Sequence, residues 1–203
     1  FIQRRKETLE EVLIPTQVPN LQLITGATDI LELANPKFTQ KQRLIQAIKS
    51  LSADFILIDL GAGTNFNVLD FFNASHDGII VVCPEPASIQ NGYQFIKNAL
   101  YRKISQEFYD CPGVLEMLDR TASPDYPDGC KNLVEFGERL RSMDPENWER
   151  YIRVKEPYQP KLIINRAQNQ KEMAVAEALR STTRRYLDID VKPVGYLPDD
   201  ETV

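Results

Sequence analysis

The sequence predicts an α/β protein with a mostly parallel, twisted sheet flanked by helices, and three observations point to this class. Two continuous apolar runs, at 55–58 and 79–83, are typical of strands buried on both faces, as parallel strands are. A third apolar run lies at 162–164. Patterns with helical spacing precede and separate these runs, which is the order of strand–helix–strand units.

The chain opens with two short predicted elements. Residues 4–13 predict a short helix, with Thr8 as its N-cap and Glu11 three residues later completing a capping box. Residues 18–26 alternate between apolar and polar side chains and end on a glycine, which predicts a strand.

A predicted helix over 39–51 leads into the most informative segment. Its apolar positions repeat at helical spacing, which leaves Lys41 on the opposite, solvent-facing side. The apolar run 55–58 then ends in Asp59 and the glycine-rich turn 61–63. A carboxylate at the end of a buried strand can hold Mg²⁺ through water, and such a turn lets a backbone N–H approach a phosphate. The alternative is a strand that simply ends in an aspartate and a loop.

The second half of this unit repeats the pattern. Residues 64–74 predict a helix, and the wholly apolar run that follows predicts another strand, over 78–83. The chain leaves that strand through the turn Pro84-Glu85-Pro86 and enters a predicted helix over 88–101. Two such strands imply a sheet that is covered on both faces.

The segment 102–159 has a different character, with several aromatic residues, acidic loops and five prolines between Pro112 and Pro157. It predicts a helical insertion. One helix carries an apolar stripe of Leu133, Phe136, Leu140 and Met143, and another opens with Asp144 as N-cap and Pro145 at its first position. Such stripes usually form local core rather than a groove for a partner, but surface aromatic residues make this the segment in which to search for a protein partner.

The α/β pattern returns after the insertion. Residues 160–166 predict a buried strand that ends in Asn165 and Arg166, a helix follows over 168–186, and a last strand covers 191–197. Three arginines of that helix, Arg180, Arg184 and Arg185, are expected to face solvent. The amide of Asn165 has a donor and an acceptor, so it can read the edge of a base or simply form a turn.

Three segments occur in an order typical of one family: DLGAG at 59–63, VVCPEPASI at 81–89 and LIINRA at 162–167. With them the chain resembles the MinD/ParA family of deviant P-loop ATPases, in its FlhG/FleN-like branch, over about 9–100 and 160–203. The resemblance implies a P-loop NTPase-like fold in a single domain that includes the insertion.

The resemblance also implies a site for ATP or ADP with Mg²⁺. Asp59 would fix the metal ion through water, and Gly63 would sense the γ-phosphate. The residues implied for the base pocket are Asn165, which would contact adenine, with Arg166, Pro198 and Asp199. Hydrolysis would relax the glycine turn and so control a homodimer. Glu85 lies where relatives place a residue near the dimer interface, or it is a solvated loop carboxylate.

One part of the family pattern is missing. The family binds phosphates with a KGGxGKT-type loop, and this sequence, which starts at Phe1, contains none. We expect a chain that begins inside the domain, is incomplete at its N-terminus, and is inactive as an ATPase by itself. The alternative is a degenerate family member that acts as a nucleotide-independent interaction module. The family's role in flagellar number or cell-pole positioning, and its membrane-targeting tail, are implied by resemblance alone.

Composition limits the other functions. The 203 residues are 42% hydrophobic, enough for one α/β domain, and the net charge of -5 argues against a general nucleic-acid binder. The three cysteines have neither disulfide nor metal spacing, which favours the cytoplasm, with peripheral attachment at the inner membrane through a tail as a further expectation. Cys83 is expected in the core, and His76 in a solvated loop.

Overall fold

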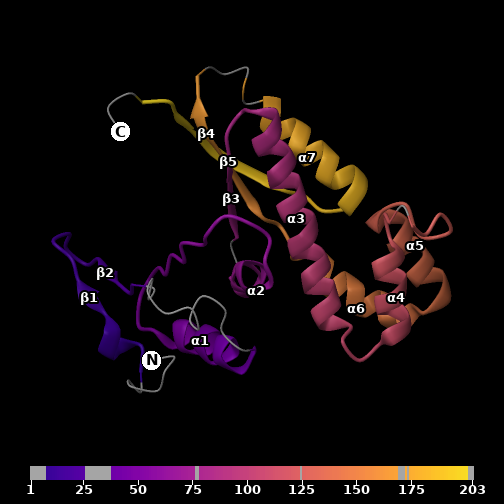
Figure 1. Cartoon of the computed structure of the whole chain (residues 1–203), viewed down its shortest axis with the longest axis horizontal. Helices are drawn as coiled ribbons and strands as arrows, with labels where there is room; N and C mark the ends of the chain where they lie inside the picture. The colour runs from indigo at the N-terminus through magenta and orange to yellow at the C-terminus, as the bar shows by residue number, and fades with distance from the viewer. Residues whose placement is uncertain are drawn as a thin grey trace. The chain divides into compact units, whose positions relative to one another are not determined.

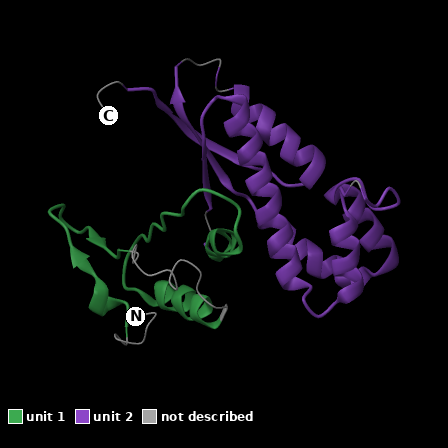
Figure 2. Cartoon of the chain, viewed as in Figure 1, with its two compact units in different colours: residues 1–74 green, residues 75–203 purple. Residues whose placement is uncertain are grey.

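The computed structural model describes residues 8–25, 38–75, 78–123, 125–168, 172 and 174–200. The chain divides into two compact units, Phe1–Ala74 and Ser75–Val203, which are coloured separately in Figure 2. Among the residues just given, no helix is both long enough and apolar enough to cross a membrane.

Two helices of the first unit confirm the sequence prediction. They are α1 (Phe38–Ser50) and α2 (Phe66–Ala74). The start of α2 is set by Asn65, whose side-chain oxygen accepts hydrogen bonds from the backbone N–H groups of Asn67 and Val68, both at 3.1 Å. These bonds satisfy N–H groups that have no partner within the helix.

The prediction that Lys41 faces solvent is wrong. Lys41 is buried where α1 meets α2, and its ammonium group forms an ion pair with the buried Asp70. It also donates a hydrogen bond of 3.0 Å to the side-chain oxygen of Asn67. A lysine is tolerated inside only when a counter-charge lies beside it, and here that charge comes from the next helix, which the pattern of α1 alone cannot reveal.

The N-terminal elements are shorter than predicted. In place of a helix over 4–13 the structure has a 3₁₀ turn, η1 (Glu10–Val12), and residues 1–7 lie outside the described part. Half of the predicted capping box is present, since the Thr8 N–H donates to the Glu11 carboxylate at 3.1 Å.

Of the strand predicted over 18–26, the structure contains β2 (Gln22–Leu23), which pairs antiparallel with β1 (Ile14–Pro15). Asn20, with a φ of 64°, lies in the connection between the two strands. Asparagine is one of the few residues that enter this left-handed region readily, so it suits a tight turn there.

The buried strand predicted at 55–58 is also wrong. Residues 52–60 contain no strand, and the side chains of Phe55 and Leu57 are 90% and 89% exposed. A strand needs a neighbour for its N–H and C=O groups. In the described residues of this unit the only strands are β1 and β2, which pair with each other.

The second unit contains the parallel sheet that the sequence predicts. Its strands are β3 (Ile79–Val82), β4 (Lys161–Ala167) and β5 (Lys192–Pro198), in the order β3-β4-β5, and both pairings are parallel (Figure 1). Helix α3 (Pro86–Glu107) follows β3, and α7 (Ala174–Leu187) connects β4 to β5.

Helices α3 and α7 pack together on one face of this sheet (Figure 1). The side chains under them are buried, namely Ile80, Val82, Leu162 and Ile164. On the opposite face of β3, Ile79 and Val81 are 46% and 56% exposed. The prediction of a sheet covered on both faces is therefore wrong for β3, because the described helices that contact the sheet in this unit pack on one side.

The segment between α3 and β4 is helical, as predicted. It holds α4 (Pro112–Arg120), α5 (Leu133–Met143) and α6 (Pro145–Lys155). Asp144 caps α6 as predicted, because its carboxylate accepts the Asn147 N–H at 3.1 Å. The apolar stripe of α5 is buried except for Met143, which is exposed.

Candidate functional site at the carboxyl edge of the sheet

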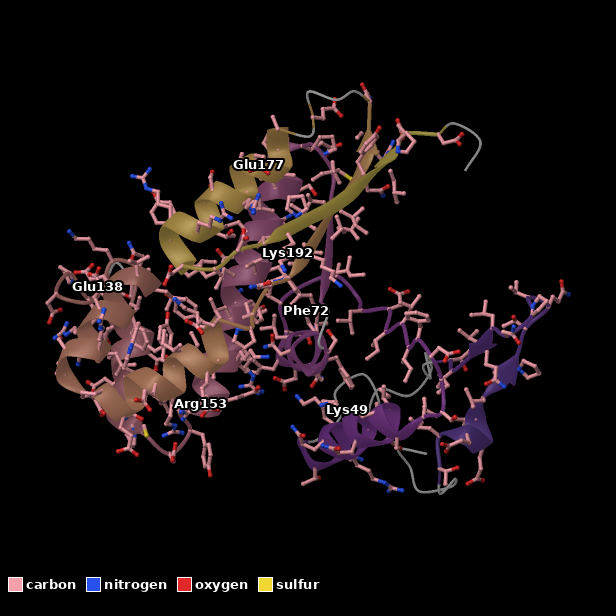
Figure 3. The ribbon with its side chains drawn as sticks, turned by 180° about the vertical axis from the view of Figure 1, so that it is seen from behind. Lys49, Phe72, Glu138, Arg153, Glu177 and Lys192 are labelled. Atoms are coloured by element: carbon pink, nitrogen blue, oxygen red, sulfur yellow. The ribbon has the colours of Figure 1, made fainter. Side chains whose placement is uncertain are left out.

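The predicted base-pocket residues lie where neighbouring parallel strands end. Asn165 and Arg166 belong to the last residues of β4, and Pro198 ends β5 directly before Asp199. Ala167 pairs with Pro198 across the two strands. Lys192, labelled in Figure 3, marks the opposite end of β5. In open α/β sheets, ligands bind outside the carboxyl ends of the strands, so this edge is the candidate site.

Arg166 and Asp199 connect the ends of β4 and β5. The Arg166 Nε donates to the Asp199 carboxylate at 3.1 Å, and the Asp199 backbone N–H donates to the Ala167 carbonyl at 3.3 Å. The bond to Asp199 raises the pKa of Arg166, and the carboxylate of Glu85 acts in the same direction. The turn after β3 therefore lies near the same guanidinium group.

The side chain of Asn165 is half-buried. Its amide makes no hydrogen bond to another residue in the described part of the chain, although Arg166 beside it is paired. An amide in this state keeps its donor and its acceptor for a ligand. The role of Asn165 in reading adenine stays a prediction.

The turn after β3 is ordered by its own hydrogen bonds. The Cys83 N–H donates to the Ser88 hydroxyl at 2.9 Å, and the Ile89 N–H donates to the Glu85 carbonyl at 3.0 Å. Glu85 is the N-cap of α3, but its side chain makes no capping bond and is exposed. The expected place of Cys83 in the core is only partly met, because its side chain is partly exposed.

Asp59 and Gly63 belong to the other compact unit, so their roles towards magnesium and phosphate stay predictions. Both residues are exposed. Gly63 has a φ of 110°, a conformation that side-chain-bearing residues rarely adopt, and a Cβ there would meet no atom within 4 Å. Glycine is therefore favoured at position 63 because of the positive φ of the backbone, and not because a side chain would clash with neighbouring atoms.

No group of three or more His, Cys, Asp or Glu side chains that could hold a metal ion occurs within the described residues. Magnesium bound together with a nucleotide commonly takes only one or two protein carboxylates, with waters and phosphate oxygens as its other ligands. The lone carboxylate of Asp59 fits that mode. His76 lies outside the described part.

Sequence reasoning missed the ion pairs of this unit. Arg180 and Arg184 both bind the Asp190 carboxylate, with nitrogen–oxygen distances of 2.7 Å and 3.0 Å. Arg184 and Arg185 are exposed, as expected, whereas Arg180 is partly buried. The acidic loop that follows α7 is the one feature of the sequence that hints at these ion pairs. Whether its carboxylates meet the arginines of α7 depends on how the chain folds back after the helix, which the sequence does not show.

Ser75–Val203 is thus an α/β unit whose three parallel strands, with their helices, are compatible with a P-loop-like fold. No protein-family model matches the chain. Over 79 residues the chain is 30% identical to a protein of Pseudomonas aeruginosa named antiactivator FleN. The match covers 38% of this chain and 28% of the length of FleN, so the chain spans less than a third of this relative. It supports a relationship to FleN- and MinD-like proteins.

Proposed function

We propose that the protein is a nucleotide-binding regulator of the MinD/ParA type, and that the carboxyl edge of the β3-β4-β5 sheet takes the adenine base of ATP or ADP. The observation that carries the proposal is the meeting of Asn165, Pro198 and the turn after β3 at one edge of a parallel sheet. Such edges bind nucleotides in many α/β proteins. The partial identity to FleN supports the same class.

The residues present fit the base half of a nucleotide. The half-buried amide of Asn165 keeps both of its hydrogen-bonding functions, and the polar backbone around Pro198 and Asp199 lies at the end of the adjacent strand. Bound ATP with magnesium would supply a cleavable phosphoanhydride bond. The sequence holds no KGGxGKT-type loop for its phosphates, so the contacts proposed for this chain are those to the base, to magnesium and, through one backbone N–H, to the terminal phosphate.

Asp59 and Gly63 complete the proposal. Asp59 would hold magnesium through water, and the backbone N–H of Gly63 would contact the terminal phosphate. Loss of that contact would relax the exposed glycine turn, which is the order-to-disorder change used by nucleotide switches. In this proposal the switch controls a homodimer, and ATP turnover acts as a timer.

The name antiactivator describes a regulator, so we extend the proposal to action through a protein partner. The helical segment is the proposed surface, because Tyr109 and Met143 are large, exposed apolar side chains there. Contact with a partner would remove such side chains from water, which is favourable. We further propose that this regulator controls flagellar number and attaches to the inner membrane. Both of these proposals rest on the resemblance to the FlhG/FleN-like branch alone.

Thermal unfolding with added nucleotide tests the proposal. Mg-ATP and Mg-ADP should each raise the unfolding midpoint in a saturable way, because a ligand that binds only the folded state stabilises it by about 2.7 kcal/mol at a hundred times its dissociation constant. Mg-GTP should act more weakly. No shift with any of the three nucleotides would contradict the base site.

Substitutions of Asn165 and Asp59 test whether these two residues cause the nucleotide response. Asn165→Ala should remove the difference between ATP and GTP, whereas Asn98→Ala, on α3, serves as the matched control and should keep it. Asp59→Ala should remove the dependence of ATP binding on magnesium. An unchanged magnesium dependence in that variant would exclude Asp59 as a metal ligand.

A nucleotide-independent interaction module is the second candidate function. It is favoured by the exposure of Phe55 and Leu57, because adjacent large apolar side chains in water mark contact sites. If the protein is such a module, nucleotides should leave its unfolding midpoint unchanged. The double variant Phe55→Ser, Leu57→Ser should then show less self-association than the wild type, as measured by sedimentation velocity.

A further inference from the structure

The pairing of β4 with β5 contains an extra residue beside the proposed base site. Ile164 pairs with Tyr196 and Ala167 pairs with Pro198, so two residues of β4, Asn165 and Arg166, lie opposite the single residue Leu197. This is a β-bulge, and bulges in parallel pairs are rare. They often occur next to functional sites, where they re-aim a side chain.

The bulge is made by the backbone of Arg166, whose φ is +56°. Four residues other than glycine have positive φ in the described part, and Arg166 is the one that lies within a strand. A left-handed conformation is disfavoured for any residue with a Cβ, so it persists only when the surrounding structure holds it.

The bulge changes which way the side chains of β4 point. Leu162 and Ile164 are buried, and strict alternation would place Arg166 on the same buried face. Instead Arg166 is exposed, and Ala167 takes the buried position. The left-handed turn therefore keeps a charged side chain out of the core and interrupts the regular ladder at Asn165.

Two bonds to Asp199, the residue that follows β5, hold this turn. The Arg166 guanidinium group bonds the Asp199 carboxylate at 3.1 Å, and the Asp199 N–H bonds the Ala167 carbonyl at 3.3 Å. Both bonds therefore connect the carboxyl-terminal side of the bulge to Asp199, while the amide of Asn165 has no hydrogen-bond partner among the described residues.

We propose that Arg166 is a positioning residue: the left-handed turn of its backbone aims the half-buried Asn165 amide at a purine base and sets the preference for adenine. This inference rests on the proposed function. Its distinguishing claim is that the backbone conformation at position 166, and not the charge of the side chain, determines base selectivity.

Two variants separate conformation from charge. Arg166→Gly and Arg166→Val both lack the guanidinium group, but glycine adopts positive φ freely, whereas a β-branched residue resists it most strongly. Dissociation constants for Mg-ATP and Mg-GTP are measured by calorimetric titration of the full chain, together with the unfolding midpoint of each variant. Arg120→Val, at an exposed ion pair on α4, is the control.

The preference for ATP over GTP should survive in Arg166→Gly and in Arg120→Val. It should fall by about three- to tenfold in Arg166→Val, the loss expected for one misplaced hydrogen bond. An equal preference in the glycine and valine variants, whether both keep it or both lose it, overturns the positioning role even if the valine variant is less stable. A wild-type chain without any adenine preference instead overturns the proposed function, and the positioning role with it.

Discussion

Two tyrosines, Tyr151 and Tyr158, are both buried, but their hydroxyl groups differ in hydrogen bonding. The Tyr151 hydroxyl donates to the Leu133 carbonyl at 3.4 Å. The Tyr158 hydroxyl has no partner among the described residues, although the Lys103 ammonium lies 5.6 Å from the centre of its ring. Burial raises the pKa of Tyr158 above its ordinary value of 10.

Removal of these hydroxyls should have opposite effects. Tyr158→Phe should stabilise the protein by about 1 kcal/mol, because it removes a buried polar group without a partner, whereas Tyr151→Phe should destabilise it by about as much. Urea unfolding of both variants measures the difference. Destabilisation by Tyr158→Phe would mean that its hydroxyl is bonded in solution.

The Asp190 carboxylate gives a pH dependence with a defined sign. Hydrogen bonds from Arg180, at 2.7 Å and 3.1 Å, together with Arg184, hold the pKa of Asp190 at about 2, below its ordinary value of 3.8. A carboxyl whose pKa is lower in the folded state stabilises the fold above the unfolded pKa. That stabilisation is lost as pH falls through the folded value.

Asp190→Asn should therefore lower the unfolding midpoint at neutral pH. The gap between variant and wild type should narrow below about pH 3.8 and close near pH 2, because the wild-type carboxyl is then protonated as well. Thermal unfolding followed at a series of pH values tests this. A gap that is constant across the series would exclude the ion pairs as its cause.

At the scale of elements, helices were predicted better than strands. The spacing of apolar residues over 39–51 and 64–74 predicts α1 and α2, because helical hydrogen bonds are local. The run at 55–58 has the composition of a buried strand, but its partners must come from elsewhere in the chain. The composition of the run does not reveal whether partner strands exist, and in the structure the segment is unpaired and exposed.

The contact between α3 and β3 depends on one small residue. Gly92 is buried, and a Cβ there would lie 2.7 Å from Cγ1 of Val82. Val82 is β-branched and has little rotamer freedom, so the helix would have to move. By contrast, a Cβ on Gly113 in α4 would meet nothing within 4 Å.

Gly92→Ala should destabilise the protein by about 1–3 kcal/mol, the usual cost of overpacking a core. The matched control Gly113→Ala should be stabilising by up to about 1 kcal/mol, because alanine is the better helix former. Chemical unfolding of the two variants measures the change in the free energy of unfolding that each substitution causes. Equal effects would show that the helix–strand contact is looser than the structure indicates.

At the scale of the whole molecule, the two units differ in how their backbones are bonded. The second unit has a three-stranded ladder under two helices, whereas the strands described in the first form one pair of two-residue segments. Local stability follows such differences, because segments without backbone hydrogen bonds and buried contacts open most easily.

Hydrogen exchange should show this contrast along the chain. Amides of residues 54–60 should exchange close to the rate of an unstructured peptide, while those of β4, the central strand, should be among the slowest. Mass spectrometry of the intact chain after timed labelling measures both. Protection at 55–58 comparable to β4 would mean that this segment pairs as a strand in solution.

The sequence by itself determined the α/β class, the helices other than α4, the three parallel strands β3, β4 and β5, and the candidate residues at the ends of the last two strands. These follow from apolar spacing and capping residues, which act between near neighbours. The tertiary structure decided the burial of Lys41, the open face of β3, the exposed run at 55–58 and the bulge at Arg166. Each of these depends on a partner from a distant segment, such as Asp70 or Asp199, and no local pattern identifies which distant group a residue will meet.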